Sequence, residues 1–430
     1  MATEDHLSRT MLLLERDLGI NDPDLLRRAL CAPVVVLVAD KGTVESVAGQ
    51  VAVSTSANLL ARSGHQVFID TPDAPLIGYQ PPMSGKTFHE ALGDLGGQLV
   101  DGAFVAIGCP LLPADIAFVF GDGNAGIGTR AKQLYSVGCS DWSGSLRKWP
   151  LQSSWTALDW PMGPMAAATL VAAEAFKVTG RALLHHSSDG GHFRELFAPA
   201  VEAHLELAPE HTPKVSALAE FDIISAGAVS NGFLYAMLRL PDVSGTYRVF
   251  EGDVSDHSNR NRNVLLTPTF VDRPKALLFK ELSRGIRTEP IQRHFVEGDL
   301  PSLAPRVVVG VDDIPTRWML ARGKADWMGV GATTHFAAMA SVHYSYAACP
   351  ACLHPRDERI DGHTPTVAFV SFMAGLMVAA DFLRDLGGIE ARMMSHYRYA
   401  VPLQMDGQWE SNVSPIGNCP ARCAASRIRA

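Results

Sequence analysis

The sequence predicts an α/β protein whose two halves repeat one strand–helix–strand pattern. In the first half, the apolar runs 32–38 and 65–70 flank a segment of small residues, and the second run ends in an aspartate. In the second half, the apolar runs 221–224 and 246–250 flank a helical segment that opens on a glycine turn. Alternating strands and helices favour mostly parallel sheets covered by helices. We therefore expect two Rossmann-like domains, one in each half.

The first half is expected to contain an additional strand before its helix. The valine-containing segment 49–53 predicts a short strand, and a helix is predicted to start at Ser54 and to end near Gly64. We expect the domains at residues 1–200 and 215–430. The linker is placed between Gly180 and Lys214, where His, Pro and Glu are frequent and the hydrophobic periodicity fades.

Length and composition indicate a folded protein with two domains. The 430 residues exceed an ordinary single core, and 47% hydrophobic with 19% charged residues is typical of a globular chain. A net charge of −8 with scattered basic residues argues against nucleic-acid binding. The N-terminus lacks the order of a signal peptide, and the uncharged stretch 366–380 is shorter than the roughly 20 residues of a bilayer span. We expect a cytoplasmic protein with no membrane partner and a buried helix at 366–380.

The seven cysteines fall into two groups. Three are isolated in the first half, and four form two close pairs in the second half. The paired residues are Cys349, Cys352, Cys419 and Cys423. Two short-spaced pairs supply the four thiolates that a closed tetrahedral zinc site needs, so we predict a structural Zn²⁺ site. Buried thiols or a redox pair are the alternatives.

Residues suited to nucleotide binding follow the strands of the second half. The turn after 221–224 leads into a helix, and backbone N–H groups at a helix start can hold phosphate. Acids, an amide and cations then follow the run 246–250, and a further aspartate follows the apolar run 307–311. In chain order these residues are Gly227, Glu251, Asp253, Asn259, Arg262, Lys275 and Asp312.

This order resembles the ATP site of the ubiquitin-activating and ThiF/MoeB-like adenylating enzymes. The resemblance implies that the acid-x-acid pair Glu251 and Asp253 follows the second strand, with the first acid on the ribose hydroxyls. It implies that Asn259 and Arg262 contact the triphosphate, which suits the planar, always charged guanidinium. Lys275 is implied to contact the phosphates or the acyl-adenylate.

The resemblance extends to a magnesium ligand and to an arginine near the N-terminus. Asp312 resembles the family's magnesium-binding aspartate, and a hard cation on phosphates needs only one or two carboxylates. The segment Leu7-Ser-Arg9 resembles one that sends an arginine into the neighbouring domain's ATP site, so Arg9 is implied to serve the second half. The chain departs from the family's three-glycine turn, because Ser225 and Ser230 flank the single Gly227.

The two halves differ where the family's chemistry takes place. The first half lacks both the glycine at its strand–helix turn and a Ser-Asn-x-Asn-Arg segment after Asp70. We expect two ThiF-type domains, an inactive N-terminal copy and an active C-terminal copy, which form a pseudo-dimer within one chain. Whether two chains form a homodimer is left open. The implied cofactors are ATP, Mg²⁺ and Zn²⁺.

The implied reaction is ATP-dependent adenylation of the C-terminal carboxylate of a ubiquitin-like protein, with release of pyrophosphate. The partner is expected to be such a protein or a peptide ending in glycine, and a conjugating-enzyme-like protein is a possible acceptor. No cysteine lies between Asp312 and Cys349 or between Cys352 and Cys419, so no thioester nucleophile is predicted there. Of the isolated cysteines, Cys139 is the best candidate, but we predict a core role for it. The alternatives are adenylation of a small peptide or a tRNA-linked group, and a non-catalytic scaffold.

Overall fold

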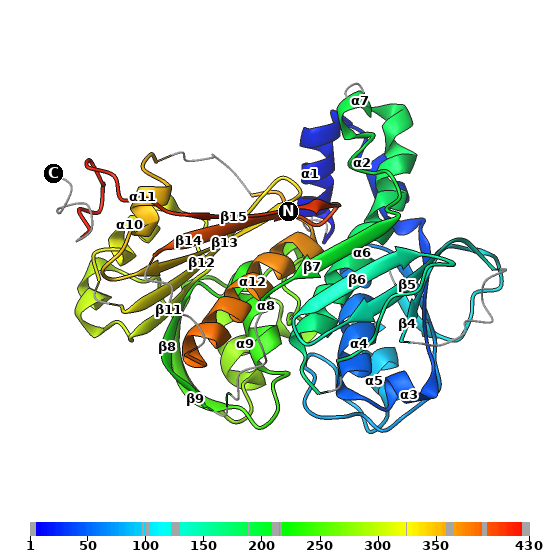
Figure 1. Ribbon diagram of the computed structural model, residues 1–430, viewed down its shortest axis with the longest axis horizontal. Coiled ribbons are helices and arrows are strands. Elements are labelled where there is room, and N and C mark those ends of the chain that lie inside the picture. The colour runs from blue at the N-terminus through cyan, green and yellow to red at the C-terminus, as the bar shows by residue number, and fades with distance from the viewer. Residues whose placement is uncertain are drawn as a thin grey trace.

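A computed structural model describes residues 6–423, apart from residues 97, 98, 100–103, 122–129, 158, 188, 189, 209–214, 216, 324, 358–363 and 389–393. Two sheets organise these residues, one in each half (Figure 1). No helix among them is long and apolar enough to cross a bilayer.

The first sheet has seven strands in the order β3-β2-β1-β4-β5-β6-β7 over the described residues. These are β1 (Val34–Ala39), β2 (Gln66–Asp70), β3 (Phe104–Ile107), β4 (Ala114–Phe120), β5 (Ala131–Cys139), β6 (Ser143–Lys148) and β7 (Glu202–Glu206). The pairings from β3 to β5 are parallel, and those from β5 to β7 are antiparallel. β1 is a continuous run of apolar residues, as expected for a central parallel strand with both faces covered.

The second sheet repeats this order and adds one strand. Its eight strands run β10-β9-β8-β11-β12-β13-β14-β15 in the described part of the chain. They are β8 (Ala217–Ile224), β9 (Ser244–Phe250), β10 (Ile286–Ile291), β11 (Arg306–Val309), β12 (Trp327–Thr334), β13 (Ala337–Tyr344), β14 (His396–Val401) and β15 (Gln404–Asn412). Pairings from β10 to β12 are parallel and the others antiparallel. The predicted α/β class with two mostly parallel sheets is confirmed.

Helices cover the sheets and fill the space between them (Figure 1). They are α1 (Ser8–Leu18), α2 (Pro23–Cys31), α3 (Lys41–Val44), α4 (Val47–Arg62), α5 (Phe88–Gly96), α6 (Met162–Leu183), α7 (Gly190–Phe193), α8 (Ala228–Met237), α9 (Lys275–Leu282), α10 (Ile314–Leu320), α11 (Pro350–Leu353) and α12 (Ala368–Leu386). Short 3₁₀ turns occupy Leu184–His186, His257–Asn259, Pro268–Phe270 and Glu297–Ser302.

One hydrophobic core runs through both halves. α6 of the first half packs on α4 and on α12, and α12 packs on α8. The ring of Phe176 on α6 lies 5.5 Å from that of Phe369 on α12, measured between centroids. α8 and α12 approach so closely that a Cβ on Gly375 would lie 2.3 Å from the carbonyl oxygen of Val229. α6 and α12 therefore join the two halves, and α8 and α12 within the second half have little freedom to slide past each other.

The predicted strand at 49–53 is wrong, because these residues lie inside α4. Ser46 caps this helix, with its Oγ accepting the N–H of Gly49 at 3.0 Å. The helix is buried from Ala48 to Arg62, so apolar residues such as Val51 and Val53 lie on more than one of its faces. A helix that is buried on all sides has little amphipathic period, and its short apolar runs look like strands.

The first sheet also extends beyond residue 200. β7 pairs with β6 in antiparallel register, from Ser143 opposite Glu206 to Arg147 opposite Glu202. Residues 202–206 thus complete the first sheet within the stretch expected to be a linker, and residues 209–214 of that stretch lie outside the described residues. The predicted buried helix at 366–380 is confirmed as α12, which continues past Asp381 to Leu386. The Asp381 carboxylate inside this helix is buried and paired with Arg398 at 2.8 Å.

Candidate functional site

Seven of the residues predicted for the nucleotide site line one cavity of 460 Å³. They are Arg9, Gly227, Asp253, Asn259, Arg262, Lys275 and Asp312. The cavity lies beyond the carboxyl ends of β8, β9 and β11 and at the N-terminus of α8, which is where open α/β sheets bind ligands. Its volume falls within the range of roughly 300–1,000 Å³ typical of small-molecule sites.

The turn between β8 and α8 presents the start of a helix to this cavity. No side chain within the described residues caps α8, whose N-cap is Gly227. Ser225 adopts a φ of 77°, a left-handed conformation that costs a residue with a Cβ about 1–2 kcal/mol. Two hydrogen bonds offset this cost, since Ser225 Oγ donates to Glu251 at 3.2 Å and accepts the N–H of Gly227 at 3.2 Å.

Ser230 is accommodated by a glycine on the neighbouring strand. The family pattern places a glycine at this helix position, whereas here Ser230 is fully buried. Gly310, directly after β11, faces it, and a Cβ on Gly310 would lie 2.3 Å from Ser230 Oγ. Strand and helix can therefore still approach closely, because the residue without a side chain, Gly310, follows the strand β11 and does not lie in the helix α8.

Glu251 is placed differently from the role implied for it. It is buried, and its carboxylate accepts the N–H groups of Ala226 and Asp253, each at 2.9 Å. In the described part of the chain it is not among the residues that line the cavity, whereas Asp253 is. Glu251 therefore fixes the turn between β8 and α8, and Asp253 presents the exposed carboxylate.

The segment from Asp256 to Arg262 forms a tight turn along the cavity wall. Asp256 accepts the N–H of Ser258 at 2.7 Å, and the Asn259 side chain accepts the N–H of Asp256 at 3.3 Å. The N–H of Asn263 donates to the Asn259 carbonyl at 2.9 Å. Arg262 donates to the carbonyl of Ser258, so its guanidinium lies against its own turn. These bonds hold the two predicted triphosphate contacts on one short, ordered stretch.

Lys275 and Asp312 close the cavity from two other elements. Lys275 begins α9, and its Nζ lies 3.0 Å from the Asp253 carboxylate. Asp312 follows β11 and accepts the hydroxyl of Thr364 at 3.2 Å. Three hydroxyl side chains also line the cavity, from Thr364 and Thr366 before α12 and from Ser371 in its first turn. Hydroxyls beside or within an apolar helix carry little signal of their own in a sequence.

Arg9 reaches the cavity from the other half of the chain. It lies on α1, is 8% exposed, and lines the cavity beside residues of the second half. The next residue, Thr10, accepts the side-chain amide of Asn261 at 3.0 Å and donates to the Thr366 carbonyl at 3.4 Å. α1 is therefore fastened to both walls of the cavity at the turn that carries Arg9.

The equivalent position in the first half is filled by protein. The short helix α3 stands between β1 and α4, and its Thr43 packs on the end of β4. A Cβ on Gly121, which follows β4 as Gly310 follows β11, would lie 2.1 Å from Thr43 Oγ1. The space that a phosphate would need at this turn is thus taken by a side chain.

The four paired cysteines converge at the far side of the second half. All are buried, and their Sγ atoms lie within 4.8 Å of one another. Sγ separations are 3.5 Å for Cys349–Cys419, 3.6 Å for Cys352–Cys423 and 3.9 Å for Cys349–Cys352. Four sulfurs placed 2.3 Å from a tetrahedral Zn²⁺ would be about 3.8 Å apart. The donor set and its spacing fit a closed structural zinc site.

The ionisation of these thiols is unequal. Hydrogen bonding from the Cys349 thiol, helped by backbone N–H groups, lowers the pKa of Cys352. Hydrogen bonding to Cys352 and burial raise the pKa of Cys349, and burial raises that of Cys419. A divalent cation would favour the thiolate form of all four sulfurs, because thiolates are the ligands it binds.

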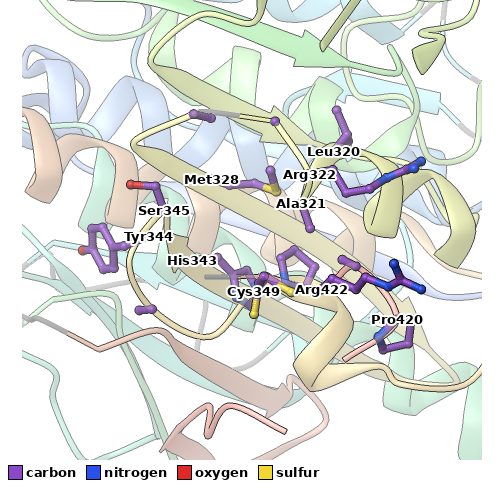
Figure 2. A pocket seen from close by; sticks show the side chains of 16 residues that line it. Leu320, Ala321, Arg322, Met328, His343, Tyr344, Ser345, Cys349, Pro420 and Arg422 are labelled. Atoms are coloured by element: carbon purple, nitrogen blue, oxygen red, sulfur yellow. The ribbon is translucent and has the colours of Figure 1, made fainter. Parts of the chain in front are cut away.

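A larger cavity of 790 Å³ lies beside the cysteine cluster and, among the described residues, shares no lining residue with the smaller cavity. Cys349, Pro420 and Arg422 line it together with Leu320 and Met328 (Figure 2). Its other arginine is already paired, since Arg322 lies 2.9 Å from Glu297. The smaller cavity, in contrast, gathers cations, carboxylates and a helix N-terminus, and it is the candidate site.

Cys139 is a core residue, as predicted. It is 3% exposed at the end of β5, and burial raises the pKa of its thiol far above the usual range. A thiol in this state is a poor nucleophile, because the thiolate is the reactive form.

Comparisons with known proteins give one partial family match and distant structural likenesses. Residues 34–189 match the family described as BilD N-terminal domain. A search of curated proteins gave no match. The crystal structure of PaaA is 14% identical with a TM-score of 0.36, over 46% of this chain and 65% of PaaA. E. coli MccB with MccA-N7isoASN is 12% identical with a TM-score of 0.41, over 68% of this chain and 99% of MccB. E. coli MccB with ATP is 13% identical with a TM-score of 0.40, over 67% and 97%. The chain thus spans 65% of PaaA, and the site described above rests on its own geometry.

Gly310→Ala should lower the free energy of unfolding by about 1–3 kcal/mol, because the new Cβ overlaps Ser230 Oγ. Ser230→Gly in the same chain should recover most of the loss. Urea denaturation followed by circular dichroism measures both. Gly298→Ala is the matched control, since nothing lies within 4 Å of a Cβ there. Equal losses for Gly310→Ala with and without Ser230→Gly would contradict the proposed overlap.

Purified protein should carry about one zinc per chain, and Cys419→Ser should remove it and lower the apparent Tm by about 5–10 °C. Elemental analysis and thermal denaturation measure these changes. Cys109→Ser is the control, because Cys109 is exposed and lies outside the cluster. Protein that is metal-free as isolated and indifferent to added zinc would refute the metal site.

Proposed function

We propose that the chain adenylates the C-terminal carboxylate of a ubiquitin-like protein or of a peptide ending in glycine. The observation that carries this proposal is the convergence of Arg9, Arg262 and Lys275 with Asp312 around the start of α8. Three cations and a helix N-terminus suit a triphosphate, and the carboxylate suits a magnesium ion on that triphosphate. The order of these residues along the chain also resembles that of the ubiquitin-activating and ThiF/MoeB-like enzymes.

The reaction joins a carboxylate to the α-phosphate of ATP. A carboxylate oxygen attacks the α-phosphorus, the bond from that phosphorus to the α,β-bridging oxygen breaks, and pyrophosphate leaves. No general base is needed, because a carboxylic acid is ionised near pH 7. The contribution of the protein is to position the two anions and to balance the charge that develops between them.

Each side chain of the cavity has a part in this reaction. The N–H groups of α8 and the guanidinium of Arg262 hold phosphate oxygens, and Arg9 approaches from the first half. Lys275, held by Asp253, presents a cation where pyrophosphate or the adenylate lies. Asp312 and Thr364 would supply the oxygen ligands that Mg²⁺ prefers, and a bound magnesium ion would neutralise phosphate charge.

The two halves divide the work. The second half carries the nucleotide site, and the first half, whose equivalent turn is filled by Thr43, acts as a scaffold that supplies Arg9. We expect the adenylate to be passed to a thiol, sulfide or amine of a partner, and Cys139, which is buried, is not placed to receive it.

Wild-type protein should catalyse ATP–pyrophosphate exchange when one suitable small protein or peptide ending in glycine is added. Asp312→Asn should lower the exchange rate by about 10²–10³-fold, because it removes the magnesium carboxylate. Asp313→Asn is the matched control: Asp313 caps α10 through the N–H of Thr316, and asparagine caps equally well. Bound ATP without exchange for any carboxylate would show a nucleotide-binding scaffold instead of an enzyme.

Arg9→Ala should lower the same exchange rate by about 10²-fold, because it removes a cation from the triphosphate. Arg16→Ala on the same helix should stay within about twofold, since that partly exposed arginine pairs with Asp17 outside the cavity. Equal rates for Arg9→Ala and wild type would assign the site to the second half alone.

A further inference from the structure

Two buried arginines occupy equivalent places in the two halves. Arg62 ends α4, the helix between β1 and β2, and Arg239 lies just after α8, the helix between β8 and β9. Both are almost fully buried, and each reaches across the core into the other half. The two arginines differ in the loop that each contacts: Arg62 bonds to a loop of the second half, and Arg239 bonds to a loop of the first half.

Arg62 gathers backbone carbonyls from the loop that carries the predicted triphosphate contacts. Its guanidinium donates to the carbonyl of Arg260, to that of Val264 at 3.1 Å and to that of Leu266 at 2.8 Å. Its Nε donates to the side chain of Asn58 at 2.7 Å, and Asn58 in turn donates to the Val264 carbonyl at 3.0 Å. One side chain and its neighbour thus hold three carbonyls of a nine-residue loop.

The chemistry of this contact is unusual for a buried cation. Within the described residues, Arg62 donates to backbone carbonyls and an amide oxygen but to no carboxylate, and burial lowers the pKa of its guanidinium to about 9. The group still carries its charge near pH 7. A buried charge of this kind is tolerated only when its N–H groups have hydrogen-bond acceptors. If the loop carbonyls moved away, these N–H groups would be left without acceptors. The loop and the arginine therefore constrain each other.

Arg239 is the natural comparison. It donates to the Pro81 carbonyl at 2.9 Å. Pro81 lies in the first-half loop that follows β2, and the loop that Arg62 contacts lies at the equivalent place in the second half, after β9. Arg239 also donates to the Tyr235 carbonyl at 3.1 Å and lies over the Tyr235 ring. Among the described residues, none from this first-half loop lines the candidate cavity. Arg239 thus makes the same kind of cross-core bond without a candidate site at its end.

We propose that Arg62 is a positioning residue for nucleotide binding, which sets the loop of residues 258–266 so that Asn259 and Arg262 face the triphosphate. The inference rests on the proposed function for its kinetic consequence, but not for its structural one. Arg62 is outside the cavity and touches no substrate. Through it, the first half shapes the site as well as contributing Arg9.

The structural test is hydrogen–deuterium exchange on the intact chain. Arg62→Met should speed exchange of the amides in 258–266 by about tenfold, including those of Asn263 and Leu266, whose N–H groups bond within the loop. Arg239→Met is the matched control; it should leave that loop unchanged and speed exchange near Met83, whose N–H bonds to Gln80. Unchanged exchange in 258–266, or an equal change in both variants, would overturn the proposal.

The functional test is a split between KM and kcat in ATP–pyrophosphate exchange. Arg62→Met should raise the KM for ATP by about 10-fold or more, whereas Arg239→Met should keep it within about twofold. Arg62→Lys, which keeps the charge with fewer directed donors, should fall between wild type and Arg62→Met in both measurements. An unchanged KM in Arg62→Met would overturn the positioning role.

Failure of the positioning role and failure of the proposed adenylation give different experimental results. Wild-type protein without any ATP–pyrophosphate exchange activity would refute adenylation. In that case the hydrogen–deuterium exchange of Arg62→Met and Arg239→Met would still show whether Arg62 holds the loop of residues 258–266. If Arg62→Met does not fold, Asn58→Ala removes the bonds from Asn58 to Arg62 and to Val264. That variant should show the same loop-specific pattern at smaller magnitude, and a uniform change across the chain would count against the proposal.

Discussion

The packing of α6 against α12 is the contact on which the candidate site depends. These two helices join the halves into one core, and the Phe176–Phe369 ring pair lies at their junction. The glycine-permitted crossing of α8 and α12 then fixes the helix whose N-terminus faces the cavity. Because buried cores are close-packed, a shift of one half would have to move α8 and the turn beneath the proposed phosphates.

That contact brings first-half residues to the site in two layers. α1 places Arg9 in the cavity and secures its position through Thr10. Behind the cavity wall, α4 holds the loop 258–266 through Arg62 and Asn58. A single half would therefore lack both a cation and the support of its own loop, which gives a physical reason for two similar sheets in one chain.

The cysteine cluster supports the site from the opposite side. It ties residues 419–423 to residues 349–352, and Trp318 of α10 packs against it and donates to the His354 carbonyl at 2.8 Å. One residue earlier, Arg317 donates to the Val311 carbonyl at 2.7 Å, directly before Asp312. A metal that closes the cluster would stiffen α10, and through α10 the turn that presents Asp312.

The sequence by itself predicted several central strands and most of the residues that gather around the candidate cavity. Runs such as 307–311 are apolar because both faces of a parallel strand are covered, and the polar residues after such strands meet at one sheet edge. The spacing of the cysteine pairs likewise identified the four sulfurs that converge. The strand predicted for residues 49–53 was wrong, because a helix that is buried on all sides shows no amphipathic period in its sequence. Only the tertiary structure decided that Glu251 braces the turn, that Gly310 accommodates Ser230, and that Arg62 crosses the core. These outcomes depend on which backbone atoms of distant segments face a side chain, and short-range sequence patterns carry no record of that.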